Sequence, residues 1–162
     1  MKVFLDTNVI LEYFTIREEY EVVKALFQLL HKMDMALYMS VGSFYTMVFL
    51  IDKVLRKESG LKGEIRLQAL RDIMERILRT VSVAEHDNDT LLEALNDRRF
   101  KDIEDSCQYE LAQKTGCQVL ITFNIEDFPI SEDSPVTIVT PQEFLLKILY
   151  SCKEAGEKGR LI

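Results

Sequence analysis

The apolar positions of this chain alternate between short runs and longer segments with helical spacing. We expect strands at 1–5, 36–39, 81–83, 119–121 and 136–139, of which 119–121 is continuously apolar, as in a strand covered on both faces. Between them, apolar residues recur every three or four positions and predict helices at 9–14, 20–33, 43–57, 61–80, 87–96, from about 102, and from about 140. Strands that alternate with helices predict a three-layer α/β/α sandwich with a mainly parallel central sheet.

The length of 162 residues is that of one domain, which we place at 1–150. The segment 151–162 is charged and contains glycine, so we expect a flexible C-terminal tail there.

Polar residues follow two of the predicted strands directly. Asp6, Thr7 and Asn8 come after the first strand, and Asn124 and Asp127 lie in the polar segment after the fourth. Because the carboxyl ends of parallel strands lie at one edge of a sheet, we expect Asp6 and Asn124 to lie close together there.

A helix that begins with acidic residues is predicted to lie beside this edge. Asp102 and Asp105 are three residues apart and therefore share one helix face. Each acid also has a structural interpretation, because Asp6 could cap the following helix and first-turn acids favour the helix dipole. The coincidence of Asp6, Asp105 and Asn124 favours a shared cation site. Carboxylates brought together repel unless a cation is present, and oxygen-rich clusters suit Mg²⁺ or Mn²⁺.

Three segments of the chain, FLDTNVILEYF, DIEDSCQYELA and LITFNIEDF, resemble the PIN-domain family, particularly its VapC-like bacterial members. The resemblance runs from Lys2 to about Leu149 and implies a PIN-like fold with a metal-dependent ribonuclease site. It places the first family acid at Asp6 and the third at Asp105. The fourth position falls on Asn124, with Asp127 as the acid of the N-x-x-D-F signature.

The resemblance also implies roles for these residues. Asp6, Asp105 and Asn124 are the expected catalytic residues, and Asp6 and Asp105 the expected direct metal ligands. Asn124 or Asp127 is expected to hold a ligand or a metal-bound water, and Asp127 is a further expected metal residue. Thr7 and Asn8 are expected to orient the turn after the first strand.

One position departs from the family pattern. The Glu that the family usually carries after the second strand is replaced by Thr46, and no acid occurs between Asp34 and Asp52. We expect Ser40 or Thr46 to hydrogen-bond a water where this Glu usually reaches, and Asp102 to compensate as a further metal ligand.

A basic cluster precedes the acidic helix. The net charge of −7 argues against nucleic-acid binding through the overall field, but Arg98, Arg99 and Lys101 could hold a phosphate backbone locally. Compensation of the neighbouring acids is an equally good interpretation of this cluster.

Two functions remain open from the sequence. The first is an endoribonuclease that hydrolyses RNA phosphodiester bonds, as the toxin of a type II toxin–antitoxin pair with an antitoxin-like protein as its partner. The second is a PIN-like protein with a degenerate site that acts as an RNA- or protein-binding module. A phosphotransferase of the haloacid dehalogenase type would need an acid where Asn8 stands.

Location and assembly are also predicted from composition. The three cysteines are odd in number and lack metal-ligand spacing, and no signal peptide or membrane-length apolar run occurs, so we expect a cytoplasmic protein without a membrane partner. The apolar stripe of 61–80 could serve the core or a homodimer.

Overall fold

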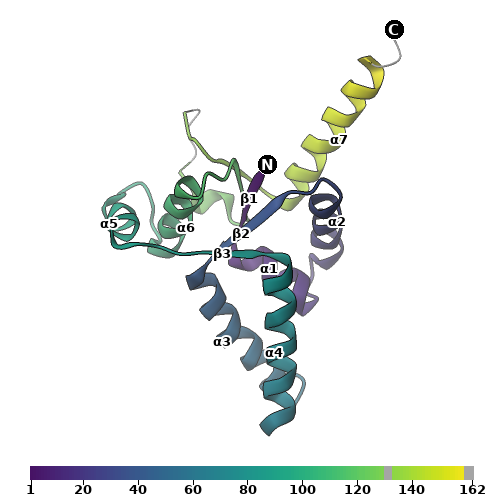
Figure 1. Ribbon diagram of the computed structural model, residues 1–162, viewed down its shortest axis with the longest axis vertical. Coiled ribbons are helices and arrows are strands. Elements are labelled where there is room, and N and C mark those ends of the chain that lie inside the picture. The colour runs from purple at the N-terminus through teal and green to yellow at the C-terminus, as the bar shows by residue number, and fades with distance from the viewer. Residues whose placement is uncertain (130–132, 159–162) are drawn as a thin grey trace.

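The computed structural model describes residues 1–129 and 133–158 (Figure 1). Its elements in chain order are β1 (Lys2–Leu5), α1 (Thr7–Thr15), α2 (Tyr20–Lys32), β2 (Ala36–Ser40), α3 (Val41–Lys57), α4 (Gly63–Thr80), β3 (Ser82–Ala84), α5 (Asn88–Asn96), α6 (Ile103–Lys114), β4 (Val119–Ile121), the short 3₁₀ helix η1 (Ile125–Asp127), β5 (Thr137–Val139) and α7 (Pro141–Lys158).

The strands form one sheet in the order β3-β2-β1-β4-β5, and every neighbouring pair is parallel. The first strand is therefore central, and Phe4 lies between Tyr38 of β2 and Leu120 of β4. All carboxyl ends of the strands lie at the same edge, which confirms the predicted α/β class and the mainly parallel sheet.

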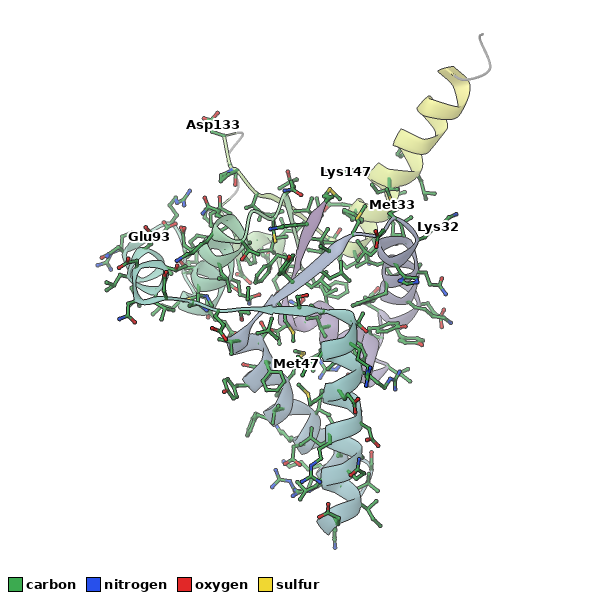
Figure 2. All side chains as sticks on the ribbon, viewed as in Figure 1. Lys32, Met33, Met47, Glu93, Asp133 and Lys147 are labelled. Carbon is green, nitrogen blue, oxygen red and sulfur yellow. The ribbon has the colours of Figure 1, made fainter. Side chains whose placement is uncertain are left out.

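Apolar side chains cover both faces of the sheet. Val3 and Leu5 of β1 pack into a core with α1, α2, α3 and α4, and Met47 of α3 is buried in this core beneath the sheet (Figure 2). Phe4 points to the other face, where it packs with Tyr109 of α6. A sheet between two helical layers is the three-layer sandwich that the alternating pattern predicts.

The α3–α4 pair extends away from the sheet as two neighbouring helices (Figure 1). An ion pair of 3.3 Å between Arg66 of α4 and Asp52 of α3 links them, and Arg56 also contacts Asp52 at 2.7 Å. Within the described ranges, no helix is long and apolar enough to cross a membrane.

The last helix begins with a capping box. Glu143 N donates to Thr140 Oγ1 at 3.1 Å, and Thr140 N donates to Glu143 Oε2 at 2.8 Å. The helix then continues to Lys158, so the predicted boundary at residue 150 falls inside α7. Residues 159–162 of the predicted tail lie outside the described residues, and the division into a domain at 1–150 and a tail stays a prediction.

Gly116 terminates α6 with a left-handed backbone, at φ 72°. Its N–H donates to Gln113 O at 2.9 Å, and the backbone N–H of the next residue, Cys117, donates to Ala112 O at 2.9 Å.

We expect Gly116→Ala to lower the free energy of unfolding by about 1 kcal/mol, because a Cβ disfavours positive φ. Urea denaturation measures this. Gly42→Ala is the control, since Gly42 lies inside α3 without positive φ and the change should be neutral or stabilising. Equal destabilisation by both substitutions would refute the conformational explanation.

Candidate acidic site

Asp6 lies directly after the central strand and is only 5% exposed. Its backbone N–H donates to Ile121 O at 3.0 Å, which ties the end of β1 to the end of β4. Both carboxylate oxygens accept hydrogen bonds. Oδ1 accepts from Gln108 Nε2 at 3.1 Å, and Oδ2 accepts from Thr122 Oγ1 at 2.7 Å. Burial raises the pKa of Asp6, while the bonds from Thr122 and Gln108 act in the opposite direction.

Acidic side chains from other segments act electrostatically on the residues at this edge. Burial raises the pKa of Asp105 to about 7, helped by the charges of Asp6, Asp102, Asp127 and Glu104, in that order. The pKa of Glu104 is also raised, by burial first and then by Asp6 and Asp102. The structure therefore brings Asp6, Asp102 and Asp127 within electrostatic reach of Asp105. Their roles as metal ligands stay predictions.

Asp102 has a clear structural role as the N-cap of α6. Its Oδ1 accepts from the backbone N–H groups of Glu104 at 2.6 Å and Asp105 at 3.4 Å. The capping interpretation of Asp102 thus describes what this carboxylate does in the structure.

Asn124 is tied into the turn after β4 by its backbone. Its N–H donates to Thr122 Oγ1 at 3.0 Å, and its carbonyl accepts from Asp127 N at 3.1 Å. Within the described part of the chain, its exposed side chain makes no hydrogen bond. Asp127, at the end of this turn, acts electrostatically on Asp105. The catalytic role of Asn124 stays a prediction.

Hydroxyl groups occupy the neighbouring strand end. Thr7 Oγ1 donates to Ser43 Oγ at 2.8 Å, Ser43 and Ser40 share a 2.9 Å hydroxyl contact, and Ser43 N donates to Ser40 Oγ at 2.8 Å. Thr46 lies one turn further along α3 and makes no side-chain hydrogen bond with the described residues. This network joins the β1–α1 and β2–α3 turns through neutral groups.

The basic cluster divides into bound and unbound side chains. Arg99 is held by Asp97, with Nε 2.9 Å from Oδ1 and a terminal nitrogen 2.6 Å from Oδ2, and its guanidinium lies 5.8 Å from the Tyr109 ring centre. Arg99 lowers the pKa of Asp97, chiefly by hydrogen bonding. This arrangement favours charge compensation for Arg99. Arg98 and Lys101 are exposed and have no ion pair within residues 1–129 and 133–158, and their contact with a phosphate backbone stays a prediction.

Sequence reasoning assigned no role to Gln108, Thr122, Glu104 or Ser43. Gln108 follows Asp105 by three residues and Glu104 by four, so helical spacing places it on the face of α6 that carries these acids. This spacing is the sequence signal that could have indicated Gln108 as a residue of the site. Thr122 stands directly after β4, where the strand-end rule also applies.

The donors at this edge fit a hard divalent cation. The charge of Asp6 acts on Asp105 and Glu104, and the buried amide oxygens Gln108 Oε1 and Asn8 Oδ1 have no hydrogen-bond partner among the described residues. Carboxylate and amide oxygens are typical ligands of such ions. In the described ranges, no group of three or more His, Cys, Asp or Glu side chains lies close enough together to hold a metal ion by itself.

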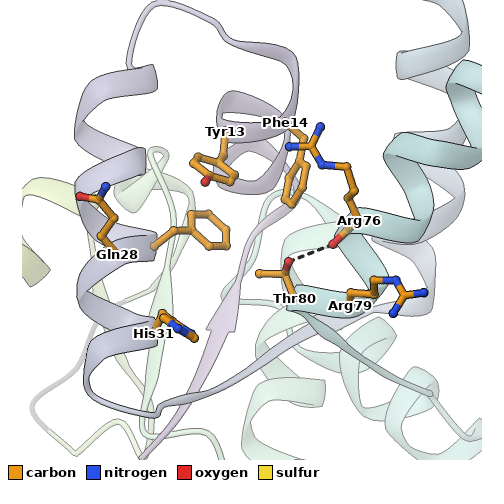
Figure 3. A pocket seen from close by; sticks show the side chains of 8 residues that line it. Tyr13, Phe14, Gln28, His31, Arg76, Arg79 and Thr80 are labelled. Atoms are coloured by element: carbon orange, nitrogen blue, oxygen red, sulfur yellow. Dashed lines mark hydrogen bonds between the residues drawn. The ribbon is translucent and has the colours of Figure 1, made fainter.

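A separate pocket of about 420 Å³ lies between α1, α2 and α4 (Figure 3). Aromatic residues Tyr13, Phe14 and Phe27 line it, and the Arg76 guanidinium lies 5.9 Å from the centre of the Phe14 ring. Its lining includes none of the acids around Asp6, so this pocket and the acidic edge are distinct sites.

The fold and the acidic edge define an α/β protein with an oxygen-rich site suited to a divalent cation. A family model described as PIN domain matches residues 2–126, and the chain belongs to this family. Ribonuclease VapC1 of Aquifex aeolicus is 31% identical over 149 residues, which cover 88% of this chain and 92% of that protein. Ribonucleases of this family generally depend on a divalent metal.

Solved structures share the fold at low sequence identity. VapBC2 from Rickettsia felis, bound to a DNA fragment from its promoter, has a chain with a TM-score of 0.62 and 12% identity, over 86% of this chain and 98% of that chain. VapBC-1 from nontypeable Haemophilus influenzae gives a TM-score of 0.57 and 18% identity, over 88% and 99%. Both confirm the PIN-like architecture.

Proposed function

We propose that this protein is an endoribonuclease that hydrolyses phosphodiester bonds of RNA with Mg²⁺ or Mn²⁺ at Asp6 and Asp105. The observation that carries this proposal is the position of Asp6. It follows the central strand directly, is buried, and accepts hydrogen bonds at both oxygens, and its charge acts on Asp105, whose pKa is raised to about 7 by burial and by the neighbouring acids. The 31% identical relative named as a ribonuclease supports the choice of RNA as substrate.

Each residue of the site has a proposed role that follows from its position. Gln108 and Thr122 fix the orientation of the Asp6 carboxylate, so that it meets a ligand without rearrangement. Asp105 supplies the second carboxylate; in the metal-free chain its pKa is raised to about 7 by burial and by the neighbouring acids, and a bound cation favours its ionised form. Exposed Arg98 and Lys101 attract the phosphate backbone that the acids alone would repel. The bound cation supplies Lewis acidity and neutralises negative charge on the phosphodiester.

The proposed biological role is that of a toxin with an antitoxin-like protein as its partner, in the cytoplasm. The similarity to chains from VapBC structures supports this role. We also propose a single PIN-like domain, and we keep a homodimer as a further proposal, because exposed Ile65, Leu67 and Leu78 on α4 leave apolar surface uncovered in the single chain.

Cleavage of a mixed-sequence single-stranded RNA tests the function. With Mg²⁺ or Mn²⁺ present, Asp6→Asn and Asp105→Asn should each reduce the cleavage rate by about 100-fold or more, because each removes a charged oxygen ligand from the cation. Asp34→Asn is the matched control. Asp34 is an exposed residue in the turn before β2, away from the strand carboxyl ends, and the variant should cleave like wild type.

A folded wild-type chain that cleaves no RNA with either ion would overturn the proposal. RNA binding would then be measured, because binding without cleavage is the outcome that the degenerate-site alternative predicts.

A further inference from the structure

Gln108 is a buried amide in the wall of the acidic site. It is 2% exposed on α6, and its Nε2 donates to Asp6 Oδ1 at 3.1 Å. Its other amide atom, Oε1, is buried without a hydrogen-bond partner in the described chain. The nitrogen of the amide is therefore hydrogen-bonded within the described chain, while the oxygen is not.

An unpaired buried acceptor is unfavourable. Such a group loses its bonds to water on folding without gaining a new one, and buried polar groups in folded proteins are nearly always paired. An apolar side chain of the same length, such as methionine, would avoid this cost. The retained amide therefore points to a partner that binds Oε1 in the working protein.

The surroundings of Gln108 determine what that partner is. The amide is bonded to Asp6, and Asp105 and Glu104 lie three and four residues before it on the same helix face. When a cation is bound, the neighbouring carboxylates are ionised, so they are acceptors and have no hydrogen to give to another oxygen. A cation, or a water molecule that it polarises, is the partner that suits an oxygen in this environment.

We propose that Gln108 belongs to the cation site, where Nε2 holds Asp6 in place and Oε1 contributes an oxygen to the coordination shell of the divalent ion. The inference rests on the proposed function, because it requires a divalent ion at Asp6. An amide suits this position because it adds an oxygen donor without adding negative charge to a group of acids that already repel one another.

Acidic side chains alone do not form a large ligand set in the described ranges, where no group of three or more His, Cys, Asp or Glu side chains is placed to hold a metal ion. A neutral oxygen donor is therefore useful to a cation at this edge. Gln108 supplies oxygen from α6, next to the carboxylate that the central strand presents.

Mn²⁺ binding to the full chain, measured by titration with electron paramagnetic resonance, tests the inference without reference to cleavage. Gln108→Met keeps the length of the side chain and removes both amide functions. It should weaken Mn²⁺ binding by about 10- to 100-fold, because it removes both the oxygen donor and the hydrogen bond that orients Asp6. In metal-free buffer its stability should stay close to wild type, since the lost bond to Asp6 is offset by removal of the unpaired acceptor.

The matched control is Gln113→Met on the same helix. Gln113 is half-buried and donates to Glu110 at 3.0 Å, away from Asp6, so this variant should bind Mn²⁺ like wild type. Gln108→Asn is a second variant for the case that Gln108→Met does not fold. It keeps the amide but withdraws it by one methylene, and it should also weaken binding.

The outcomes separate the two proposals. Wild-type affinity in a folded Gln108→Met or Gln108→Asn variant would overturn the role of Gln108 and leave the proposed function intact. A wild-type chain that binds neither Mn²⁺ nor Mg²⁺ would overturn the proposed function, and the inference with it. Loss of metal-free stability without loss of affinity would assign Gln108 a purely structural role.

Discussion

Replacing Phe4 with alanine is expected to lower the free energy of unfolding by about 3–5 kcal/mol, the usual cost of removing a buried aromatic ring. Phe4 is 0% exposed on the central strand and packs with Tyr109 and Leu120 on the α6 side of the sheet. Its neighbours on β2 and β4 are fixed by the sheet register, so the structure has little freedom to fill the cavity.

Urea denaturation followed by circular dichroism measures this loss. Phe49→Ala is the control, because Phe49 lies on α3 and is 64% exposed, so the same change should cost less than about 1 kcal/mol. Similar losses in both variants would contradict the packing described for the second face of the sheet.

Asp105→Asn is expected to stabilise the metal-free protein at neutral pH. The folded chain raises the pKa of Asp105 from 3.8 to about 7, so folding favours its protonated form. Protonated Asp105 therefore contributes to the free energy of unfolding in full below about pH 4, and this contribution is lost as the pH rises to 7. Wild type should therefore lose stability relative to the variant across this window. Partial exposure screens the effect, and we expect a difference of about 1–2 kcal/mol above pH 7.

Denaturation of both proteins in chelator-containing buffer at several pH values tests this expectation. Asp34→Asn should show no such pH-dependent difference from wild type. Addition of Mn²⁺ should stabilise wild type more than Asp105→Asn, because an ion that binds the folded state stabilises it and the variant has lost a ligand. A constant difference between wild type and Asp105→Asn from pH 4 to 8 would show that the raised pKa is wrong.

The fold follows from the sequence because its signals are local. Each predicted strand lies within a residue or two of an observed one, since a short apolar run between helical segments has few alternatives in an α/β chain. The left-handed cap at Gly116 and the capping box at Thr140 are local in the same sense, because each depends on residues within one turn.

The partners of Asp6 were harder to predict. In the sequence, Gln108 looks like an ordinary polar residue on a helix whose apolar face is poorly defined, and its contact lies across 102 positions. No periodicity encodes such a contact. Arg99 shows the opposite problem, because a basic residue beside an acidic helix suggests a ligand site. The structure shows that Asp97, two residues away, already binds its guanidinium.

The arrangement around Asp6 also has a consequence for protein synthesis. The acid itself is among the first residues made, but the two side chains that hold it come from positions 108 and 122. A chain interrupted near residue 100 contains Asp6 and the first three strands. It lacks all of α6, and with it the side chains of that helix that bind the Asp6 carboxylate or interact with its charge. The hydrogen-bonded environment of the Asp6 carboxylate is therefore complete only after residue 122 has been made.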